Sequence, residues 1–216
     1  MRTCEESLEY LKKNFNPKEF TAPIETHYIP WLNELDAELK EQSKKVYRIL
    51  EGLLSVDRIF TVGMGRSELM IRNTGMRLMH EGYEVYGVGE SYTPAIGNDP
   101  KHKDSLLFYS GSGTTRFVIT AERKAKENRV PIYGVCSNID SEAVEIAGEE
   151  NVIITKGKKI YTKREDVPLE GKEPTSFLQT ESEDKAYHIG EFIVNEIAKA
   201  KGLTEADFKK RHANAE

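Results

Sequence analysis

Between residues 58 and 155 the chain alternates short apolar runs with segments of helical periodicity. The apolar runs have the length of strands: RIFTVG, YEVYGVG, SLLFYS, VPIYGVC and NVIIT. Helical patterns follow the first run up to Gly82, the third from about Thr114 to Glu127, and the fourth from about Ser141 to Ala147. Strands and helices that alternate at this spacing build a parallel sheet with helices on both faces. The sequence therefore predicts an α/β fold.

Helical segments flank this alternating core on both sides. Upstream, Pro30 opens a long pattern of apolar residues at spacings of three and four, which runs to Leu53. Downstream, we expect one helix over residues 180–201 and a second one that Thr204 can cap.

A charged stretch without periodicity, KGKKIYTKREDVPLEGKEP, precedes the C-terminal helices. It is longer than a simple connector, so it is either a mobile lid or a disordered excursion. We therefore predict an N-terminal helical extension over residues 1–54 and one domain over residues 55–216. That domain includes a charged loop at about residues 157–175 and the C-terminal helices.

The composition excludes several classes of protein. The chain has 31 Lys and Arg against 36 Asp and Glu, a net charge of −5, which argues against a nucleic-acid surface. No apolar run approaches the roughly 20 residues of a membrane span, and the amino terminus lacks the apolar region of a signal peptide. Cys4 and Cys136 lie in unlike contexts and fit a reducing interior. We expect a soluble cytoplasmic protein that binds neither nucleic acid nor membrane.

Two glycine loops are predicted at strand ends, GMGRS at residues 63–67 and SGSGTT at residues 110–115. Each of them connects a strand to a helix, and ligands of open parallel sheets bind at such positions. A dinucleotide fingerprint would need glycine at position 68, where this chain has Glu68. A Walker A loop would need a lysine after the second glycine of SGSGTT, and none follows.

The composition of SGSGTT suits a single phosphate monoester. Its glycines, Gly111 and Gly113, let backbone N–H groups turn inward, and the start of the next helix adds positive charge. The loop also offers four hydroxyl groups, from Ser110, Ser112, Thr114 and Thr115. The alternative is that Ser112 or Thr114 only caps the helix while glycine eases the turn. Two such loops at neighbouring strand ends favour ligand binding.

With both loops placed, the chain resembles the sugar isomerase (SIS) domain family, and within it the 6-phospho-3-hexuloisomerases of the ribulose monophosphate pathway. The segments that carry the resemblance are DRIFTVGMGRS, GMRLMHEGYEVYGVGESYTP, YSGSGTT and, near the end, LTEADFKKRHA. The likeness is good over about residues 57–115, thinner to residue 155, and returns in the last dozen residues.

The resemblance implies a three-layer, flavodoxin-like, five-stranded parallel sheet with added N- and C-terminal helices. It also implies a homotetramer (a dimer is the alternative) and a cofactor-free isomerase that interconverts 3-hexulose 6-phosphate and fructose 6-phosphate. It assigns the phosphate to Ser110, Ser112 and Thr115 within a loop completed by Gly111, Gly113 and Thr114. It assigns the sugar to Gly65, Arg66 and Ser67, with the pocket bordered by Glu90, Ser91 and Thr93.

Such an isomerase needs one base and donors for an oxyanion. The resemblance places the base on Glu183, because the family's segment falls on QTESE. Helical spacing puts Glu183 on one stripe with Ala186 and Gly190, which would desolvate the carboxylate and raise its pKa. The alternative is a capping box, in which Thr180 caps the helix and Glu183 reaches back to the N–H of Thr180.

His212 lies in the family-like RHA tail and would reach the site of a neighbouring subunit, where it would shuttle protons or help to open a cyclic substrate. Helix-end packing explains His80, and surface pairing explains His188 as well as catalysis does. Neither His27 nor His102 falls in a pattern. No group of ligands has metal spacing, so we expect neither metal nor cofactor.

The chain departs from the family pattern at several positions. Glu68 stands where the family has glycine, and Ser182 stands where it has phenylalanine before the base. These departures leave open an isomerase of another sugar phosphate, or a non-catalytic phosphosugar-binding regulator.

Overall fold

The computed structural model describes residues 9, 12–13, 29–155 and 181–212. The chain divides into two units, residues 1–38 and residues 39–216, and we describe each by itself. In the first unit the helix α3 (Ile29–Glu41) begins, with Pro30 in its first turn, where a missing N–H costs no hydrogen bond. The compact second unit begins within the predicted N-terminal extension.

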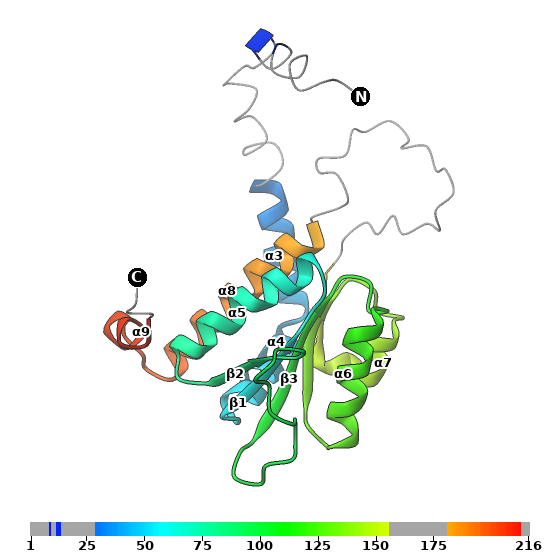
Figure 1. The fold of residues 1–216 in the computed structure, drawn as a ribbon. Coiled ribbons are helices and arrows are strands. Elements are labelled where there is room, and N and C mark those ends of the chain that lie inside the picture. Colours follow the sequence, from blue (N-terminus) through cyan, green and yellow to red (C-terminus); the bar gives the residue numbers. More distant parts are fainter. Residues whose placement is uncertain (1–8, 10–11, 14–28, 156–180, 213–216) are drawn as a thin grey trace. The chain divides into compact units, whose positions relative to one another are not determined.

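The second unit is built on a five-stranded parallel sheet with the order β2-β1-β3-β4-β5 (Figure 1). The strands are β1 (Arg58–Val62), β2 (Glu84–Gly87), β3 (Asp104–Ser110), β4 (Ile132–Cys136) and β5 (Val152–Ile154). Every residue of β1, β3 and β4 is buried, as expected for strands covered on both faces. The predicted α/β fold and its five strands are confirmed.

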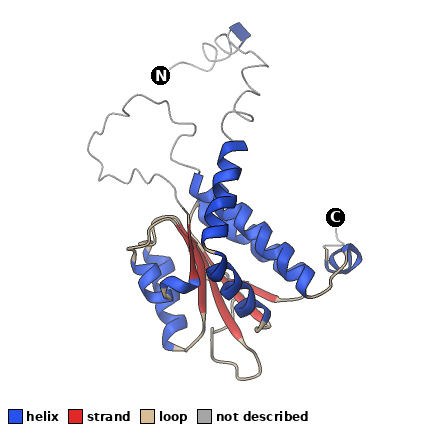
Figure 2. Cartoon of the chain, turned by 180° about the vertical axis from the view of Figure 1, so that it is seen from behind, coloured by secondary structure: helices blue, strands red, loops and turns tan. Residues whose placement is uncertain are grey.

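Helices cover both faces of the sheet (Figure 2). On one face lie α4 (Ser43–Leu54), α5 (Arg66–His80) and α8 (Glu181–Ala200); on the other lie α6 (Arg116–Glu127) and α7 (Glu142–Ala147). A short 3₁₀ helix, η2 (Glu149–Asn151), leads into β5, and α9 (Glu205–Arg211) ends the described chain. Thr204 is the N-cap of α9, as predicted, and its N–H donates to Asp207 Oδ2 at 2.9 Å.

Alternate residues of the strands feed two cores. Leu106 and Phe108 of β3 belong to the apolar cluster beneath α6 and α7. Tyr109 faces the other way, and its hydroxyl lies 3.2 Å from Thr74 Oγ1 on α5. Among the described helices, none is long and apolar enough to cross a membrane.

The long helical pattern upstream of β1 forms two helices rather than one. The backbone leaves helical geometry at Gln42, with φ −101° and ψ 19°. The side-chain amide of Gln42 donates to Ile154 O at 2.7 Å and accepts from Ile154 N at 2.8 Å. It thus pairs with the open edge of β5 as a neighbouring strand would. The periodicity is continuous in the sequence, so only this long-range contact reveals the break.

Candidate active site

The two glycine loops lie side by side at the carboxyl edge of the sheet. Gly63 follows β1 directly and Ser110 ends β3, and these strands are hydrogen-bonded neighbours with Val62 opposite Phe108. From β1 the chain moves to β2 on one side and then to β3 on the other, so the strand order reverses here. Open parallel sheets bind their ligands at such a switch point.

The loop after β3 turns hydroxyls and N–H groups towards one another. Gly113 has a φ of +64°, which favours glycine, and its N–H donates to Ser110 Oγ at 3.1 Å. The N–H of Thr114 donates to Ser112 Oγ at 3.2 Å, and Ser112 Oγ lies 3.4 Å from Thr115 Oγ1. A serine oxygen that accepts from an N–H still has its own proton to donate. The loop therefore offers several donors to an anion.

The simpler interpretation of this loop as a helix cap does not describe its geometry. The helix α6 begins at Arg116, so Thr115 is the N-cap, and the Thr115 side chain makes no capping hydrogen bond. Neither Ser112 nor Thr114 occupies the N-cap position. The N-terminus of this 12-residue helix adds its partial positive charge beside the hydroxyls.

The backbone of the loop is fixed from the side of β4 and α7. Three successive carbonyls accept hydrogen bonds there: Gly111 O from Ser137 N at 3.3 Å, Ser112 O from Asn138 Nδ2 at 3.4 Å, and Gly113 O from Ala143 N at 3.0 Å. A Cβ atom on Gly113 would lie 2.0 Å from Ser141 Oγ, so no side chain fits there. The loop is a preformed and closely packed turn.

The first turn of α8 brings the predicted base to both loops. Arg66 Nη2, at the start of α5, lies 3.4 Å from Glu183 Oε2, and Ser182 Oγ donates to the same oxygen at 3.0 Å. A Cβ atom on Gly111 would lie 3.1 Å from Ser182 Oγ, so this turn also touches the loop after β3. The Glu183 side chain is 15% exposed. Thr180, the partner in the alternative capping box, lies outside the described residues.

Close packing of α8 on α5 positions this turn. A Cβ atom on Gly190 would lie 2.1 Å from Thr74 Oγ1 and 2.8 Å from the Tyr109 hydroxyl. The helices therefore approach as closely as a glycine permits. Below Glu183, the predicted inward stripe of Ala186, Gly190, Ile193 and Ile197 is buried, which confirms the direction inferred from helical spacing.

Two further charged residues of this turn escaped sequence reasoning. Asp184 is half-buried, and burial, followed by the negative charge of Glu183, raises its pKa. The Lys185 side chain is fully buried, with Nζ 3.6 Å from Glu181 Oε1. In the sequence, both residues belong to the charged run ESEDK, which begins a helix with one apolar face. Such a run does not show which of its polar residues face inward.

The loop after β2 contacts both α5 and α6. Glu90 pairs with Arg72 of α5, and the Thr93 hydroxyl donates to Gly87 O. A Cβ atom on Gly89 would lie 3.0 Å from the Phe117 ring, so the loop also reaches the first turn of α6. The loop of the predicted border residues thus contacts α5, which follows the first glycine loop, and α6, which follows the second. In this chain Ser91 is exposed.

The loop after β1 joins this arrangement through Arg66. Gly65 precedes α5 with φ +61° and ψ −127°, a conformation that suits glycine, and Ser67 is half-buried in the first turn of the helix. Glu68, in the first turn of α5, pairs with Arg72 at 2.8 Å, and its side chain is 37% exposed. Arg72 therefore links Glu68 and Glu90.

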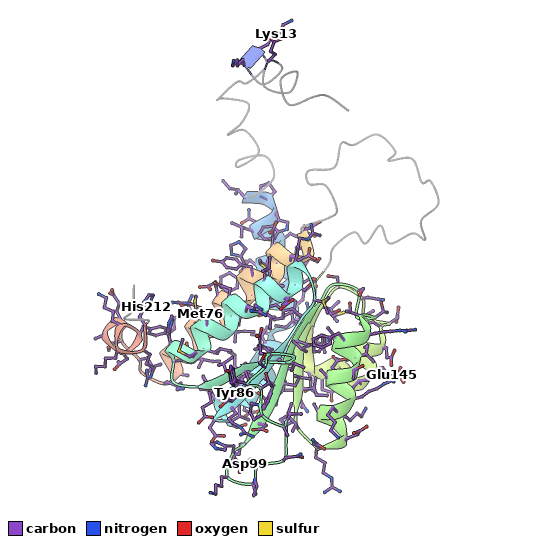
Figure 3. All side chains as sticks on the ribbon, in the orientation of Figure 1. Lys13, Met76, Tyr86, Asp99, Glu145 and His212 are labelled. Carbon is purple, nitrogen blue, oxygen red and sulfur yellow. The ribbon has the colours of Figure 1, made fainter. Side chains whose placement is uncertain are left out.

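His212 lies at the other end of α5 from the glycine loops. Its ring stacks on that of His80, the last residue of α5, with the centroids 5.2 Å apart, and Figure 3 shows it beside α9. Arg66 begins the same 15-residue helix, which spans about 21 Å. Within its own chain, His212 is therefore remote from Glu183.

The other described histidines contact side chains outside the candidate site. His80 is buried, and burial followed by the charge of His212 lowers its pKa. His188 is half-buried and meets the Tyr187 ring edge-on, and His102 Nδ1 lies 3.1 Å from Asp57 Oδ2. His27 lies outside the described residues. Within the described ranges, no group of three or more His, Cys, Asp and Glu residues has the arrangement of a metal site.

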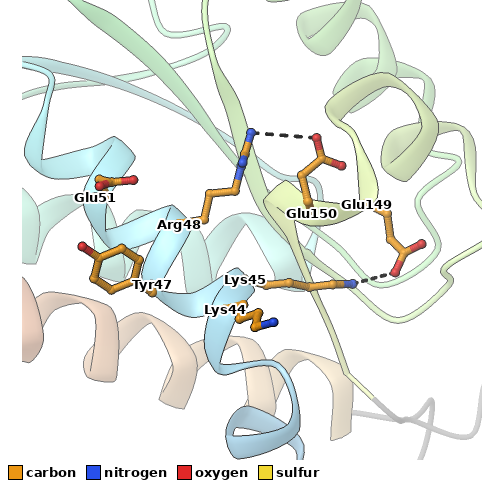
Figure 4. A pocket seen from close by; sticks show the side chains of 7 residues that line it. All are labelled: Lys44, Lys45, Tyr47, Arg48, Glu51, Glu149 and Glu150. Atoms are coloured by element: carbon orange, nitrogen blue, oxygen red, sulfur yellow. Dashed lines mark hydrogen bonds and ion pairs between the residues drawn. The ribbon is translucent and has the colours of Figure 1, made fainter.

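A separate surface pocket of about 540 Å³ lies between α4 and η2 (Figure 4). Its lining residues are Lys44, Lys45, Tyr47, Arg48, Glu51, Glu149 and Glu150. Ion pairs cross it from Lys45 to Glu149 at 2.9 Å and from Arg48 to Glu150 at 3.9 Å. Because neither glycine loop contributes to its lining, this pocket is not part of the candidate site.

Known proteins resemble this chain in sequence and in fold. No protein-family model matches the chain. An uncharacterized protein of Archaeoglobus fulgidus is 34% identical over 194 residues, which cover 90% of this chain and 97% of the relative. A 3-hexulose-6-phosphate isomerase of Methanocaldococcus jannaschii is 32% identical over 188 residues, which cover 85% of each chain.

A solved structure gives the same result. A hypothetical protein of Methanococcus jannaschii, whose crystal structure infers a molecular function of 3-hexulose-6-phosphate isomerase, is 29% identical. It superposes with a TM-score of 0.67 over 86% of this chain and 97% of that one. The chain therefore belongs to the sugar isomerase (SIS) family of phosphosugar isomerases. Within that family it is close to the 6-phospho-3-hexuloisomerases.

Proposed function

We propose that this chain is a cofactor-free isomerase that interconverts 3-hexulose 6-phosphate and fructose 6-phosphate, the reaction of the ribulose monophosphate pathway. The observation that carries the proposal is the position of Glu183. Its carboxylate is largely buried and contacts Arg66 of one glycine loop, while the neighbouring Ser182 touches Gly111 of the other. A carboxylate, a cation and a glycine loop rich in hydroxyl groups therefore lie together, and this supports the proposal.

The chemistry moves a carbonyl group from C3 to C2. Glu183 removes the proton from C2, which leaves an enediolate across C2 and C3. The same carboxylate then returns the proton to C3, and the hydroxyl proton of O2 passes to O3. Atoms and electrons balance without a redox cofactor.

The enediolate needs donors that are already in place. Arg66 Nη2 lies 3.4 Å from Glu183 Oε2, and the first N–H groups of α5 start beside it. Such preorganised donors stabilise a developing oxyanion because they need no reorganisation during the reaction. Gly65 and Ser67 line the sugar in this arrangement, and Glu90, Ser91 and Thr93 border it.

The loop after β3 anchors the phosphate group. Ser110, Ser112 and Thr115 supply hydroxyl donors, and Gly111, Gly113 and Thr114 supply the turn with its N–H groups. Binding of the phosphate holds C2 and C3 near Glu183. The binding energy of the phosphate group thereby orients the reacting carbons and lowers the barrier of the proton transfer.

The proposal includes self-association, as a homotetramer or a dimer. His212 is remote from Glu183 of its own chain, so its proposed role in proton transfer or ring opening requires the site of a second copy. An apolar stripe on α5 supports an interface: Leu69, Met76 and Met79 recur at helical spacing and are 61%, 48% and 38% exposed.

The test offers the purified chain 3-hexulose 6-phosphate and follows the formation of fructose 6-phosphate, with Glu183→Gln as the matched variant. We expect turnover by the wild type, and loss of turnover with retained fructose 6-phosphate binding in the variant. Sugar-phosphate binding without turnover by the wild type would instead favour a regulatory phosphosugar-binding protein. Full activity of Glu183→Gln would keep the isomerase and remove the base.

A further inference from the structure

The strand order places three loops in sequence along the carboxyl edge of the sheet. The phosphate loop follows β3, the Arg66 loop follows β1, and the loop that carries Glu90 follows β2. Neighbouring strands are about 4.8 Å apart, so the β2 loop lies roughly 10 Å from the phosphate loop along the carboxyl edge. That separation is comparable with an extended six-carbon sugar. With its phosphate at β3 and its C2 and C3 at Glu183, as in the proposed function, a sugar 6-phosphate points its C1 end towards the loop after β2.

Three charged side chains meet at that end. Arg72 Nη2 lies 2.8 Å from Glu68 Oε1 and also pairs with Glu90 Oε1. One guanidinium shared between two carboxylates leaves a net charge of −1. The side chains of Glu68, Arg72 and Glu90 are 37%, 55% and 51% exposed, so their charge acts on a ligand through solvent as well as by contact.

This cluster also joins α5 to the loop after β2. Glu68 belongs to the first turn of α5, two residues after Arg66, and Glu90 sits on the loop that reaches Phe117 of α6. The carboxylates are therefore fixed relative to the Arg66–Glu183 pair. Arg66 itself faces Glu183, so its charge is already balanced within the site.

We propose that the Glu68–Arg72–Glu90 cluster selects sugar 6-monophosphates with a neutral C1 end and excludes sugars that carry a second anionic group at C1. The inference rests on the proposed function for the orientation of the sugar. A C1 hydroxyl donates a hydrogen bond to a carboxylate, whereas a C1 phosphate or carboxylate meets the like charge of Glu68 and Glu90. Glu68 is thus a specificity-determining residue.

The experiment measures binding rather than turnover. Calorimetry gives the Kd values of fructose 6-phosphate and fructose 1,6-bisphosphate for the full chain at low and high salt. We expect the wild type to bind the bisphosphate at least ~10-fold more weakly than fructose 6-phosphate. Glu68→Gln should lower the ratio of the two Kd values, bisphosphate over monophosphate, by about 3- to 10-fold. Arg72→Gln should widen the ratio, because it leaves two carboxylates unbalanced. Both effects should shrink at high salt.

Glu145→Gln is the matched control, because it makes the same charge change at an exposed position on α7. An unchanged ratio in Glu68→Gln, or a change of equal size in Glu145→Gln, overturns the inference. A wild type that discriminates between the two sugars but does not isomerise would remove only the proposed function. A chain that binds neither sugar would overturn both.

Discussion

Arg66 and Glu183 lie 117 positions apart in the sequence, and their side chains meet at 3.4 Å. Arg66 is the first residue of α5 and Glu183 the third of α8, so the contact joins the starts of two packed helices. Ser182 donates to the same carboxylate oxygen, Oε2. The other oxygen, Oε1, is the one we assign to the substrate proton.

Arg66→Ala should lower kcat for 3-hexulose 6-phosphate by about 100-fold or more, because it removes an oxyanion donor and a partner of the base. KM should rise much less, since the phosphate is held elsewhere. Arg66→Lys should recover part of kcat because it restores the charge but not the planar fork. Steady-state kinetics separate the two constants. A kcat that stays unchanged in Arg66→Ala would contradict the assigned role.

Glu183→Gln and His212→Ala should each be inactive alone and active when mixed. If each site combines Glu183 of one chain with His212 of another, mixed oligomers contain some sites with both residues intact. The measurement is turnover after the two variants are unfolded and refolded together. Mixing each variant with itself is the control. Full activity of His212→Ala alone would remove this histidine from the mechanism.

Gly113→Ala should weaken phosphate binding and destabilise the fold by about 2–4 kcal/mol. The variant strains a φ of +64° and places a Cβ atom 2.0 Å from Ser141 Oγ. Gly202→Ala is the matched control, because Gly202 has φ +62° with open space around it. It should cost only about 1 kcal/mol from backbone strain. Denaturant unfolding gives both values, and equal losses would show that packing behind the loop is unimportant.

Glu122 should make the protein less stable as pH rises. Burial, followed by the charge of Glu142, raises the pKa of Glu122 from 4.5 to about 8, and neither carboxyl oxygen has a hydrogen-bond partner among the described residues. Between these two pH values the unfolded chain releases a proton that the folded chain keeps. The free energy of unfolding therefore falls with pH in this window, by about 1.4 kcal/mol per unit for this group.

Glu122→Gln should remove this dependence, so its Tm should exceed that of the wild type at pH 8 and approach it near pH 4.5. Thermal unfolding across this range provides the measurement. Glu127→Gln on the same helix is the control, because the Glu127 side chain is 65% exposed and pairs with Lys124 at 3.1 Å. Parallel profiles of wild type and Glu122→Gln would contradict the prediction.

The sequence predicted the strands of the sheet better than it predicted the helices upstream of β1. Apolar runs such as SLLFYS and VPIYGVC fall on β3 and β4, because a strand buried on both faces must be apolar throughout. The break at Gln42 escaped detection, since it depends on a hydrogen-bonded partner, Ile154, 112 positions away. Periodicity is a local signal and carries no such information.

The same division applies to the candidate site. The sequence by itself determined the two glycine loops, because backbone conformations such as φ +64° at Gly113 need a residue without Cβ, and that requirement is local. Only the tertiary structure decided that Glu183 faces Arg66, that Arg72 joins Glu68 to Glu90, and that His212 lies at the far end of α5. The contact between Glu183 and Arg66 depends on how α8 packs against α5 at Gly190, and the link from Arg72 to Glu90 joins α5 to the loop after β2. Packing between distant segments has no signature in either segment alone.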